Sequence, residues 1–174
     1  MAGRLIPIQS VEVTSAVSHI DLGGVNWDSS FDVYKLVING MSVTINGDSP
    51  YARILDSSNN PISTSTYKFA QKIIFGATAV ATGGSNTFTY LPLANNIMTN
   101  NDTFSSNAIW YLYNFNSISE PSYVVYSNAH RRTTNNELVG FQGGGMLPAD
   151  AHKGVRIYAG TTLASGKATL YGVA

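Results

Sequence analysis

Few side chains in this sequence are of the kinds that exchange protons, attack a substrate or bind a metal ion. The 174 residues include three histidines and no cysteine. Asp150 and His152 stand two positions apart, so an extended segment would present a carboxylate and an imidazole on one face, as a general acid–base pair or half of a metal site requires. No third ligand or nucleophile follows at a motif spacing, and we interpret the pair as chance spacing.

Structural or surface roles are favoured for the other two histidines. His19 stands beside Ile20 in an alternating pattern, as in a strand. His130 precedes Arg131 and Arg132 in what we interpret as a polar loop. This trio could bind an anion, but a solvated basic patch is the favoured interpretation.

The ten acidic residues are scattered along the chain. Folding could bring two carboxylates together, as in glycoside hydrolases, and this enzyme alternative stays open. Five acidic residues lie in or near turn clusters, where aspartate commonly caps backbone amides, and we favour that role. Asn46-Gly47-Asp48 only faintly resembles a calcium loop, and we interpret the glycosylation triplet Asn101-Asp102-Thr103 as loop composition.

Two glycine-rich segments resemble nucleotide-binding loops but lack their defining features. Residues 160–167 end in Ser-Gly-Lys, but the glycine spacing is one residue too long and Ala168 replaces the required magnesium-binding hydroxyl, so a hairpin turn is predicted. The glycines at 143–145 have no strand before and helix after them, so a flexible loop is predicted. A nucleophile elbow does not occur. We expect no catalytic, cofactor-binding or metal-binding residue and no enzyme activity.

Aromatic residues are the remaining candidates for binding. Two tryptophans and ten tyrosines could stack on sugars, with asparagine and serine providing hydrogen bonds. Most of these rings stand at alternating strand positions, which favours a core or subunit-interface role over weak glycan binding. Trp27, in the loop of residues 23–30, is the exception.

Composition excludes several partners. Only 11% of residues are charged and the net charge is zero, whereas about 25% is usual for soluble domains. The longest basic run is Arg131-Arg132, so we expect no nucleic-acid partner and no membrane partner. No apolar run is long enough for a membrane span, and the first residues lack the apolar segment of a secretion signal, which predicts a soluble, unprocessed product. Hydrophobic residues make up 44%, enough for a core.

Apolar and polar residues alternate with a period of two, which predicts an all-β fold. Expected strands cover residues 6–13, 17–22, 31–38, 41–45, 51–55, 67–75, 87–91, 107–115, 123–126, 137–141, 155–159 and 167–173. Turn signals stand at 23–24, 39–40, 46–48, 57–61, 83–86, 95–96 and 143–145. Asn39-Gly40 is the strongest hairpin signal, and only residues 147–153 indicate a helical turn.

Short strands without amphipathic helices predict a single-domain antiparallel β-sandwich or jelly roll. We divide the chain into residues 1–16, an N-terminal arm or first strand, and residues 17–174, the sandwich domain. Both faces of 107–115 and of 31–38 are largely apolar, although the outer face of a sandwich strand is normally solvated. A second subunit or an overlying loop should cover them, which predicts a homo-oligomer.

Two segments resemble small virion structural proteins of marine tailed bacteriophages. Residues 18–38, SHIDLGGVNWDSSFDVYKLVI, contain an Ile-Asp strand, a loop and a strand like that family's YDVYKFVF, although residues 22–27 depart from its Phe-Thr or Phe-Ser pattern. Residues 154–160 and 164–173 resemble its final hairpin, which ends in Leu-Tyr-Gly and a hydrophobic residue. Together these segments cover about a quarter of the chain.

This resemblance implies a virion location and a β-sandwich that is commonly trimeric, and it transfers no catalytic residue. We expect a homo-oligomeric capsid decoration (cement) protein, with the phage major capsid protein or tail proteins as partners. Residues 1–14 could add a strand to the neighbouring shell. The alternative is a tail-fibre or receptor-binding module that holds a surface glycan.

Overall fold

The computed structural model describes residues 3–45, 47–76, 79–94, 105–131 and 137–174. It is an antiparallel sheet of eleven strands with one short 3-10 helix, η1 (Gly24–Asn26). The all-β, antiparallel, single-domain prediction is confirmed. The strands are β1 (Leu5–Val13), β2 (Val17–Gly23), β3 (Val33–Val43), β4 (Pro50–Leu55), β5 (Tyr67–Phe75), β6 (Ala79–Phe88), β7 (Leu91–Pro92), β8 (Ser106–Tyr113), β9 (Ser122–Arg131), β10 (Leu138–Leu147) and β11 (Gly154–Val173).

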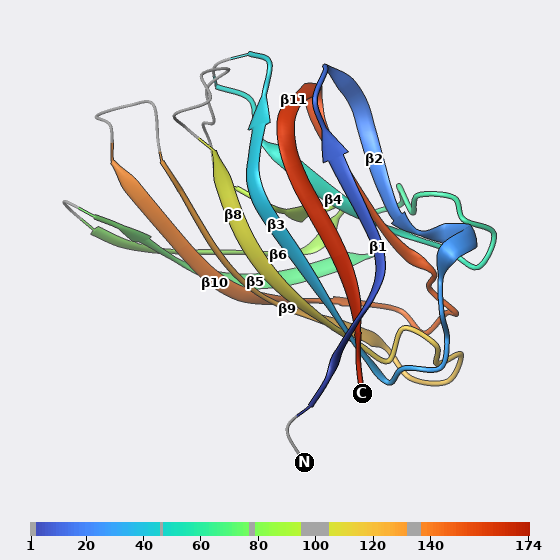
Figure 1. The fold of residues 1–174 in the computed structure, drawn as a ribbon. Coiled ribbons are helices and arrows are strands. Elements are labelled where there is room, and N and C mark those ends of the chain that lie inside the picture. The colour runs from blue at the N-terminus through green and yellow to red at the C-terminus, as the bar shows by residue number, and fades with distance from the viewer. Residues whose placement is uncertain (1–2, 46, 77–78, 95–104, 132–136) are drawn as a thin grey trace.

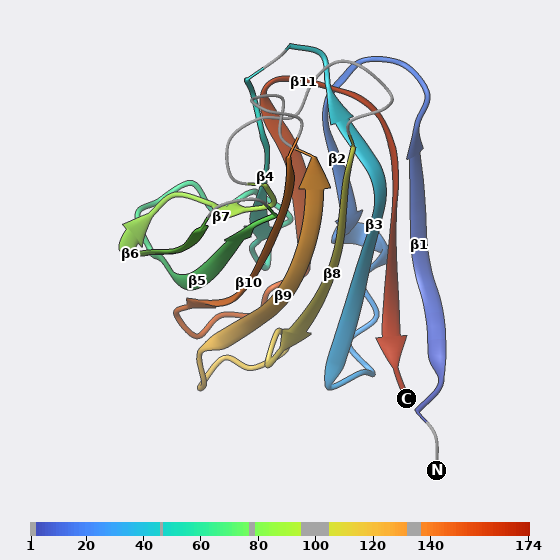
Figure 2. The same cartoon turned by 90° about the vertical axis from the view of Figure 1, so that its left-hand side faces the viewer.

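The long strand β11 belongs to both layers of the fold. Its first part, residues 154–159, pairs with β2 on one side and β4 on the other. Its last part, residues 163–173, pairs with β3, and residues 166–173 also pair with β1. The larger layer continues from β3 through β8, β9, β10 and β5 to β6, while β7 extends the smaller layer beyond β4. Figures 1 and 2 show β11, in red, running between β1 and β3.

The N-terminal segment is part of the chain's own sheet. Residues 5–13 form β1, which pairs with β11 along most of its length. Beyond that ladder, Arg4 and Ala174 exchange two backbone hydrogen bonds of 2.8 and 2.9 Å, which holds the two ends of the chain together (Figure 1). A strand added to a neighbouring shell would therefore have to use the other edge of β1.

The inner faces of the two layers enclose one hydrophobic core. It forms because alternate residues of each strand point inward, as in β8, where Ala108, Trp110 and Leu112 are buried. The largest fully buried side chains are Trp110, Tyr34, Tyr67, Phe115 and Phe141.

Two buried polar side chains tie distant segments to this core. Asn128, on β9, accepts a hydrogen bond from Trp110 Nε1 at 3.1 Å and donates one to the Leu93 carbonyl at 2.8 Å. The Tyr67 hydroxyl, on β5, accepts from the Ile54 amide at 2.8 Å and donates to the Ile62 carbonyl at 3.0 Å. Tyr67 thereby connects the far side of the larger layer to β4.

The hairpin predicted at Asn39-Gly40 is wrong, because β3 runs straight through it. Between Ile38 and Met41 the strand has one residue more than its partner β8, which is a β-bulge. Gly40 has φ +62° and donates its amide to Asn107 Oδ1 at 3.0 Å. The left-handed residue therefore serves a bulge in one strand instead of a turn between two strands.

The hairpin predicted at 160–167 is also wrong, since these residues lie inside β11. The pairing is irregular there because the strand changes layers between Ala159 and Leu163. Gly166, at φ +131°, lies within a second irregular stretch. The closing segment that resembled a final hairpin is therefore one long bent strand.

Three further expectations are corrected. The glycines at 143–145 lie within β10 and pair with both β5 and β9, so they do not form a loop. Residues 83–86, predicted as a turn, lie within β6. Residues 148–153 form no helix. The predicted features that involve Asn46, Asn95-Asn96, Asn101-Asp102-Thr103 and Arg132 lie outside the described residues.

Candidate functional site

The Asp150 and His152 pair of the sequence lies beside a buried serine. His152 is 1% exposed, and its Nδ1 lies 2.7 Å from the Oγ of Ser122. Ser122 Oγ also lies within hydrogen-bond distance of the Asn114 carbonyl oxygen, at 3.1 Å. Ser122 is fully buried and its hydrogen is engaged, so this Ser–His contact holds the loop in place and offers no accessible nucleophile.

Burial favours the neutral form of the His152 imidazole. It lowers the pKa of the imidazole, and the carboxylates of Asp150 and Asp56 oppose this effect only in part. These three residues line one pocket of about 400 Å³. Asp56 was missed as a partner because it lies far away in sequence and its local pattern indicates only a turn. Within the described part of the chain, no three His, Asp or Glu side chains are grouped so that they could hold a metal ion.

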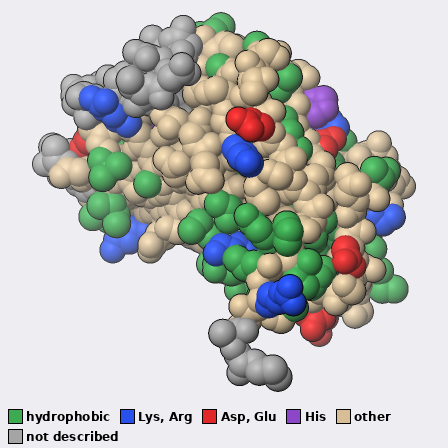
Figure 3. Space-filling view, viewed as in Figure 1, with side chains coloured by type: hydrophobic (Ala, Val, Ile, Leu, Met, Phe, Trp, Pro, Cys, Tyr) green, Lys and Arg blue, Asp and Glu red, His purple; other side chains and the backbone are tan. Residues whose placement is uncertain are grey.

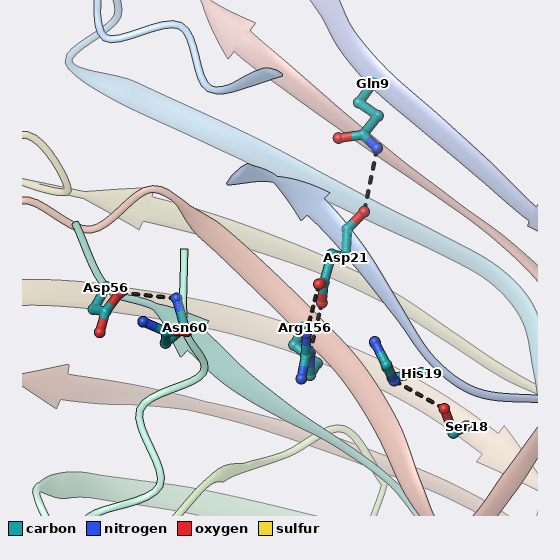
Figure 4. Close-up of polar contacts among 7 residues, drawn as sticks. All are labelled: Gln9, Ser18, His19, Asp21, Asp56, Asn60 and Arg156. Atoms are coloured by element: carbon teal, nitrogen blue, oxygen red, sulfur yellow. Dashed lines mark hydrogen bonds and ion pairs between the residues drawn. The ribbon is translucent and has the colours of Figure 1, made fainter. Parts of the chain in front are cut away.

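The other two histidines are separated from this pocket. His19, on β2, is exposed, and its Nδ1 lies 2.9 Å from Ser18 Oγ (Figure 4). His130 is not in a polar loop, because it lies within β9, 2% exposed and edge-on to Phe141. A basic patch centred on His130 is therefore wrong.

Most described aspartates bind backbone amides or an arginine. Asp28, Asp56 and Asp150 each accept hydrogen bonds from amides one to four residues further along the chain. Asp21 forms a two-fold hydrogen-bonded ion pair with Arg156 across β2 and β11, with both distances at 2.7 Å (Figure 4). These contacts agree with the capping role that the sequence favoured.

Trp27 is not an open sugar platform. Its ring lies against Tyr34, with centroids 3.9 Å apart, and against Phe115 at 5.9 Å. Its Nε1 donates to Asn116 Oδ1 at 3.0 Å, and Asn116 in turn donates to the Phe31 carbonyl at 2.9 Å. Trp27 therefore anchors the loop that follows β2.

A different group of aromatic rings lies on the outer face of the smaller layer. Tyr51 lies 4.4 Å from Tyr90 and 5.8 Å from Tyr158, measured between ring centroids, and all three are half-buried. The Arg53 guanidinium lies over Tyr158 at 4.8 Å and is fixed by a hydrogen bond to the Thr89 carbonyl. Burial raises the pKa of Tyr158 to about 12, so this ring stays a neutral hydroxyl donor. We call Tyr51, Tyr90, Tyr158 and Arg53 the aromatic ledge.

The outer face of the larger layer carries apolar side chains that are exposed or half-buried among the described residues. Cross-strand neighbours Val33, Tyr113 and Tyr123 form one row, and Val37 and Ile109 begin another. Figure 3 shows hydrophobic side chains gathered near the termini, with Lys or Arg side chains among them. We call Val33, Val37, Ile109, Tyr111, Tyr113, Tyr123 and Val125 the outer apolar face.

A shallow groove of about 370 Å³ continues this face across β10. Gly144 lies between Val125 on β9 and Ala70 on β5 and contributes no side chain, so the groove runs over bare backbone. Tyr123 and Met146 form one wall. The sequence indicated the two-faced strands of this surface, but it did not indicate the groove, because the glycines were interpreted as a loop.

Comparison with known proteins identifies no family. No protein-family model matches the sequence, and no curated protein matches it. Solved structures of infectious bursal disease virus match over 99% of this chain: the Gt strain at 9% identity and TM-score 0.13, the VP2 subviral particle at 7% and 0.16, and the Gx strain at 10% and 0.15. This chain covers only 40 to 42% of the length of those chains. TM-scores this low mean that the backbones do not superpose, so these matches carry no argument about fold or role.

Within the described residues, no helix is long and apolar enough to cross a membrane.

Proposed function

We propose that this chain is a non-enzymatic structural protein that assembles into homo-oligomers by burying its outer apolar face. The observation that carries the proposal is the exposure of large apolar side chains at the centre of that face. Ile109 and Tyr123 are each 43% exposed and Val125 is 51% exposed. They lie on neighbouring strands, so they form one continuous surface.

This face has the composition of a subunit interface. Aromatic residues are enriched and charged residues are depleted at interface cores. The single cation in its central row, Lys35, lies over the Tyr111 ring at 5.6 Å, which leaves its charge next to an aromatic surface. A stable interface takes about 800 Å² from each partner, a patch of several neighbouring strands. A neighbouring copy of the chain would cover this face; in a trimer it would do so with a different part of its surface, because a ring of three is closed by head-to-tail contacts.

The finer proposal is a trimeric capsid decoration protein of a tailed bacteriophage. It rests on the resemblance of residues 18–38, 154–160 and 164–173 to such virion proteins. It also fits the composition, because closely packed identical copies with few charges do not repel one another. A trimer on the major capsid protein would make three contacts at once, so weak single contacts would sum to tight attachment.

Labelling of intact particles tests this location. An antibody against the chain should decorate the whole capsid shell of the phage that encodes it. Label confined to the tail would overturn the decoration role, and absence of label from purified particles would overturn the virion assignment.

The second candidate is a tail-fibre or receptor-binding module, and the aromatic ledge favours it. Half-exposed tyrosine rings beside a fixed arginine can stack on a sugar and hydrogen-bond to its hydroxyls. Binding to host-surface glycans, lost in Tyr90→Ala and kept in Tyr123→Ala, would support this candidate. Equal binding by both variants would remove it.

A further inference from the structure

The aromatic ledge includes one of two arginines that stand opposite each other across β4 and β11. Arg53 and Arg156 are direct partners in the antiparallel register, and Asp21 on β2 is the partner of Arg156 on its other side. Side chains of directly opposite residues lie on the same face of a sheet. Asp21, Arg156 and Arg53 therefore form one row on the outer face of the smaller layer.

Among the described residues, a carboxylate pairs with only one of these two guanidinium groups. Arg156 donates from Nε and Nη2 to the two carboxylate oxygens of Asp21, both at 2.7 Å (Figure 4). Arg53 donates from Nε to the Thr89 carbonyl at 3.1 Å, and its terminal nitrogens make no hydrogen bond or ion pair within the described part of the chain. The row therefore presents one guanidinium whose charge and terminal donors are unused.

The Arg53 guanidinium is held in a fixed orientation. It lies over the Tyr158 ring at 4.8 Å from the ring centroid, and the bond to Thr89 fixes its Nε. A guanidinium that is already ordered loses less side-chain entropy when a ligand binds. Its two terminal N–H groups form a planar fork that matches the two oxygens of a carboxylate.

The tyrosines of the ledge offer flat rings and neutral hydroxyl groups beside this fork. Tyr51 lies 5.8 Å from Tyr158 and 4.4 Å from Tyr90, and Phe88 packs edge-on against Tyr90 at 4.5 Å. Burial raises the pKa of Tyr51, Tyr90 and Tyr158, so at neutral pH no phenolate is present to repel an anion. Such rings can stack on a sugar while their hydroxyls form hydrogen bonds to it.

One further carboxylate sets the orientation of an acidic ligand. The charge of Asp48 contributes to raising the pKa of Tyr51. Its two oxygens accept hydrogen bonds from the amides of Ser49 and Gly160 and from Thr161, so the Asp48 carboxylate is held in place. A negative group on a ligand should therefore turn away from Asp48 and toward Arg53.

We infer that the aromatic ledge binds an acidic sugar, whose ring stacks on the tyrosines and whose carboxylate is held by Arg53. This inference rests on the glycan-binding candidate and narrows it to sugars that carry a carboxylate, such as hexuronic acids. A neutral sugar gives the terminal donors of Arg53 no charged acceptor, so it should bind more weakly. A simple carboxylate such as acetate would pair with Arg53 but leave the rings uncovered.

NMR titration of the full chain with methyl glucuronoside and methyl glucoside tests the inference, because the two differ only in the carboxylate. Shifts of the ledge tyrosine signals at millimolar sugar measure binding. We expect the glucuronoside to bind about ten-fold more tightly, as for a charge-assisted, two-fold hydrogen bond. Arg53→Gln should reduce glucuronoside binding to the level of the glucoside. Lys167→Gln, which removes an exposed positive charge elsewhere on β11, should bind as the natural chain does.

Asp21→Asn provides a test that a purely structural role of Arg53 would not pass. It releases the Arg156 guanidinium directly opposite Arg53, so binding of the glucuronoside should tighten by about two- to five-fold, the range for one partly exposed charge. Binding of the glucoside should not change. Circular dichroism of each variant checks that the fold is kept.

The possible outcomes separate this inference from the glycan-binding candidate. Equal binding of the two glycosides would overturn the inference and leave the candidate standing, whereas binding of neither would overturn both. Unchanged glucuronoside binding in Arg53→Gln, or no tightening in Asp21→Asn, would also overturn the inference. The ledge lies on the smaller layer and the outer apolar face on the larger one, so these outcomes are independent of self-assembly.

Discussion

The carboxylate of Asp48 accepts two hydrogen bonds of 2.7 Å from Thr161, one from its backbone amide and one from its hydroxyl. Thr161 lies where β11 stops pairing with β4, at Ala159, and before it pairs with β3, at Leu163. Gly160 also donates its amide to Asp48, at 3.2 Å. Asp48 therefore fixes the point at which one strand passes from one layer of the sandwich to the other.

Replacing Asp48 should loosen this crossing. Asp48→Asn keeps the shape of the side chain but turns one acceptor into a donor that faces the Thr161 amide. We expect the free energy of unfolding to fall by about 1–2 kcal/mol, the usual range for hydrogen bonds to a charged group at a partly exposed site. Urea denaturation measures it, and Asp32→Asn, at an exposed position, is the matched control. Equal losses in both variants would contradict the role of Asp48.

The same contact predicts acid sensitivity. Partial burial by itself would raise the pKa of Asp48, but hydrogen bonds from Thr161, Ser49 and Gly160 outweigh it and hold the pKa below its ordinary value of 3.8. A depressed pKa adds stability above the unfolded value, and this is lost as pH falls through the folded value. The stability gap between the natural chain and Asp48→Asn should be complete at pH 6 and shrink below about pH 4. A gap that widens with acid would have the wrong sign.

The alternation of apolar and polar residues predicted the strands in which large apolar and polar side chains alternate. Residues 67–75 coincide with β5, and the apolar faces of 107–115 correspond to the buried and outer sides of β8. Residues 79–86 and 143–145 were missed as strand residues, because small residues and glycines leave no pattern to detect. A glycine with a left-handed backbone, such as Gly40, occurs both in hairpin turns and in β-bulges. Whether Gly40 forms a turn or a bulge therefore depends on the pairing of β3 with β8 and β11, which the local sequence does not show.

The candidate sites were less predictable, because each is assembled from distant segments. The aromatic ledge takes its rings from β4, β11 and the residues after β6, and no local pattern links these three. The pocket lined by Asp56, Asp150 and His152 is also assembled from distant segments. Only the outer apolar face could be expected from the sequence, because its apolar residues recur at alternate positions within single strands.

The Asn128 links should make a large contribution to stability. Asn128→Leu would leave the buried Trp110 N–H and the Leu93 carbonyl without partners. Unfolding in guanidinium should show a loss of about 2–4 kcal/mol, since each unsatisfied buried group costs about 1–3 kcal/mol. Ser127→Ala, an exposed neighbour on β9, should change stability by less than about 0.5 kcal/mol. A small effect of Asn128→Leu would mean that the two groups find other partners.

The glycines of β10 should differ sharply in their tolerance of alanine. A Cβ at Gly143 would clash with the Ala70 carbonyl oxygen and lie 2.8 Å from Gln71 Cα, so β5 and β10 would have to separate. We expect Gly143→Ala to lower the melting temperature, at a cost of about 2–3 kcal/mol. Gly140→Ala, whose Cβ would meet nothing nearer than 3.9 Å, should be neutral or slightly stabilising. The reverse order would contradict the packing described for this strand.

If the outer apolar face is a subunit interface, two lysine variants on the same strand should differ in their effect on assembly. Val125→Lys places a charge at its centre, whereas Ala129→Lys places one at an exposed position on the same strand. If the face is buried between copies, Val125→Lys should dissociate the assembly while leaving the fold intact by circular dichroism. Ala129→Lys should leave the assembly unchanged. Dissociation by both variants would show that added charge, and not this face, controls assembly.

The mass of the natural chain in solution tests self-assembly most directly. Sedimentation equilibrium at micromolar concentration should give the mass of two or more chains of 18.6 kDa, and of three chains for the trimer proposed here. Val125→Lys should shift that mass toward one chain. A natural chain that sediments at 18.6 kDa at all concentrations would contradict the proposal that the outer apolar face is a subunit interface.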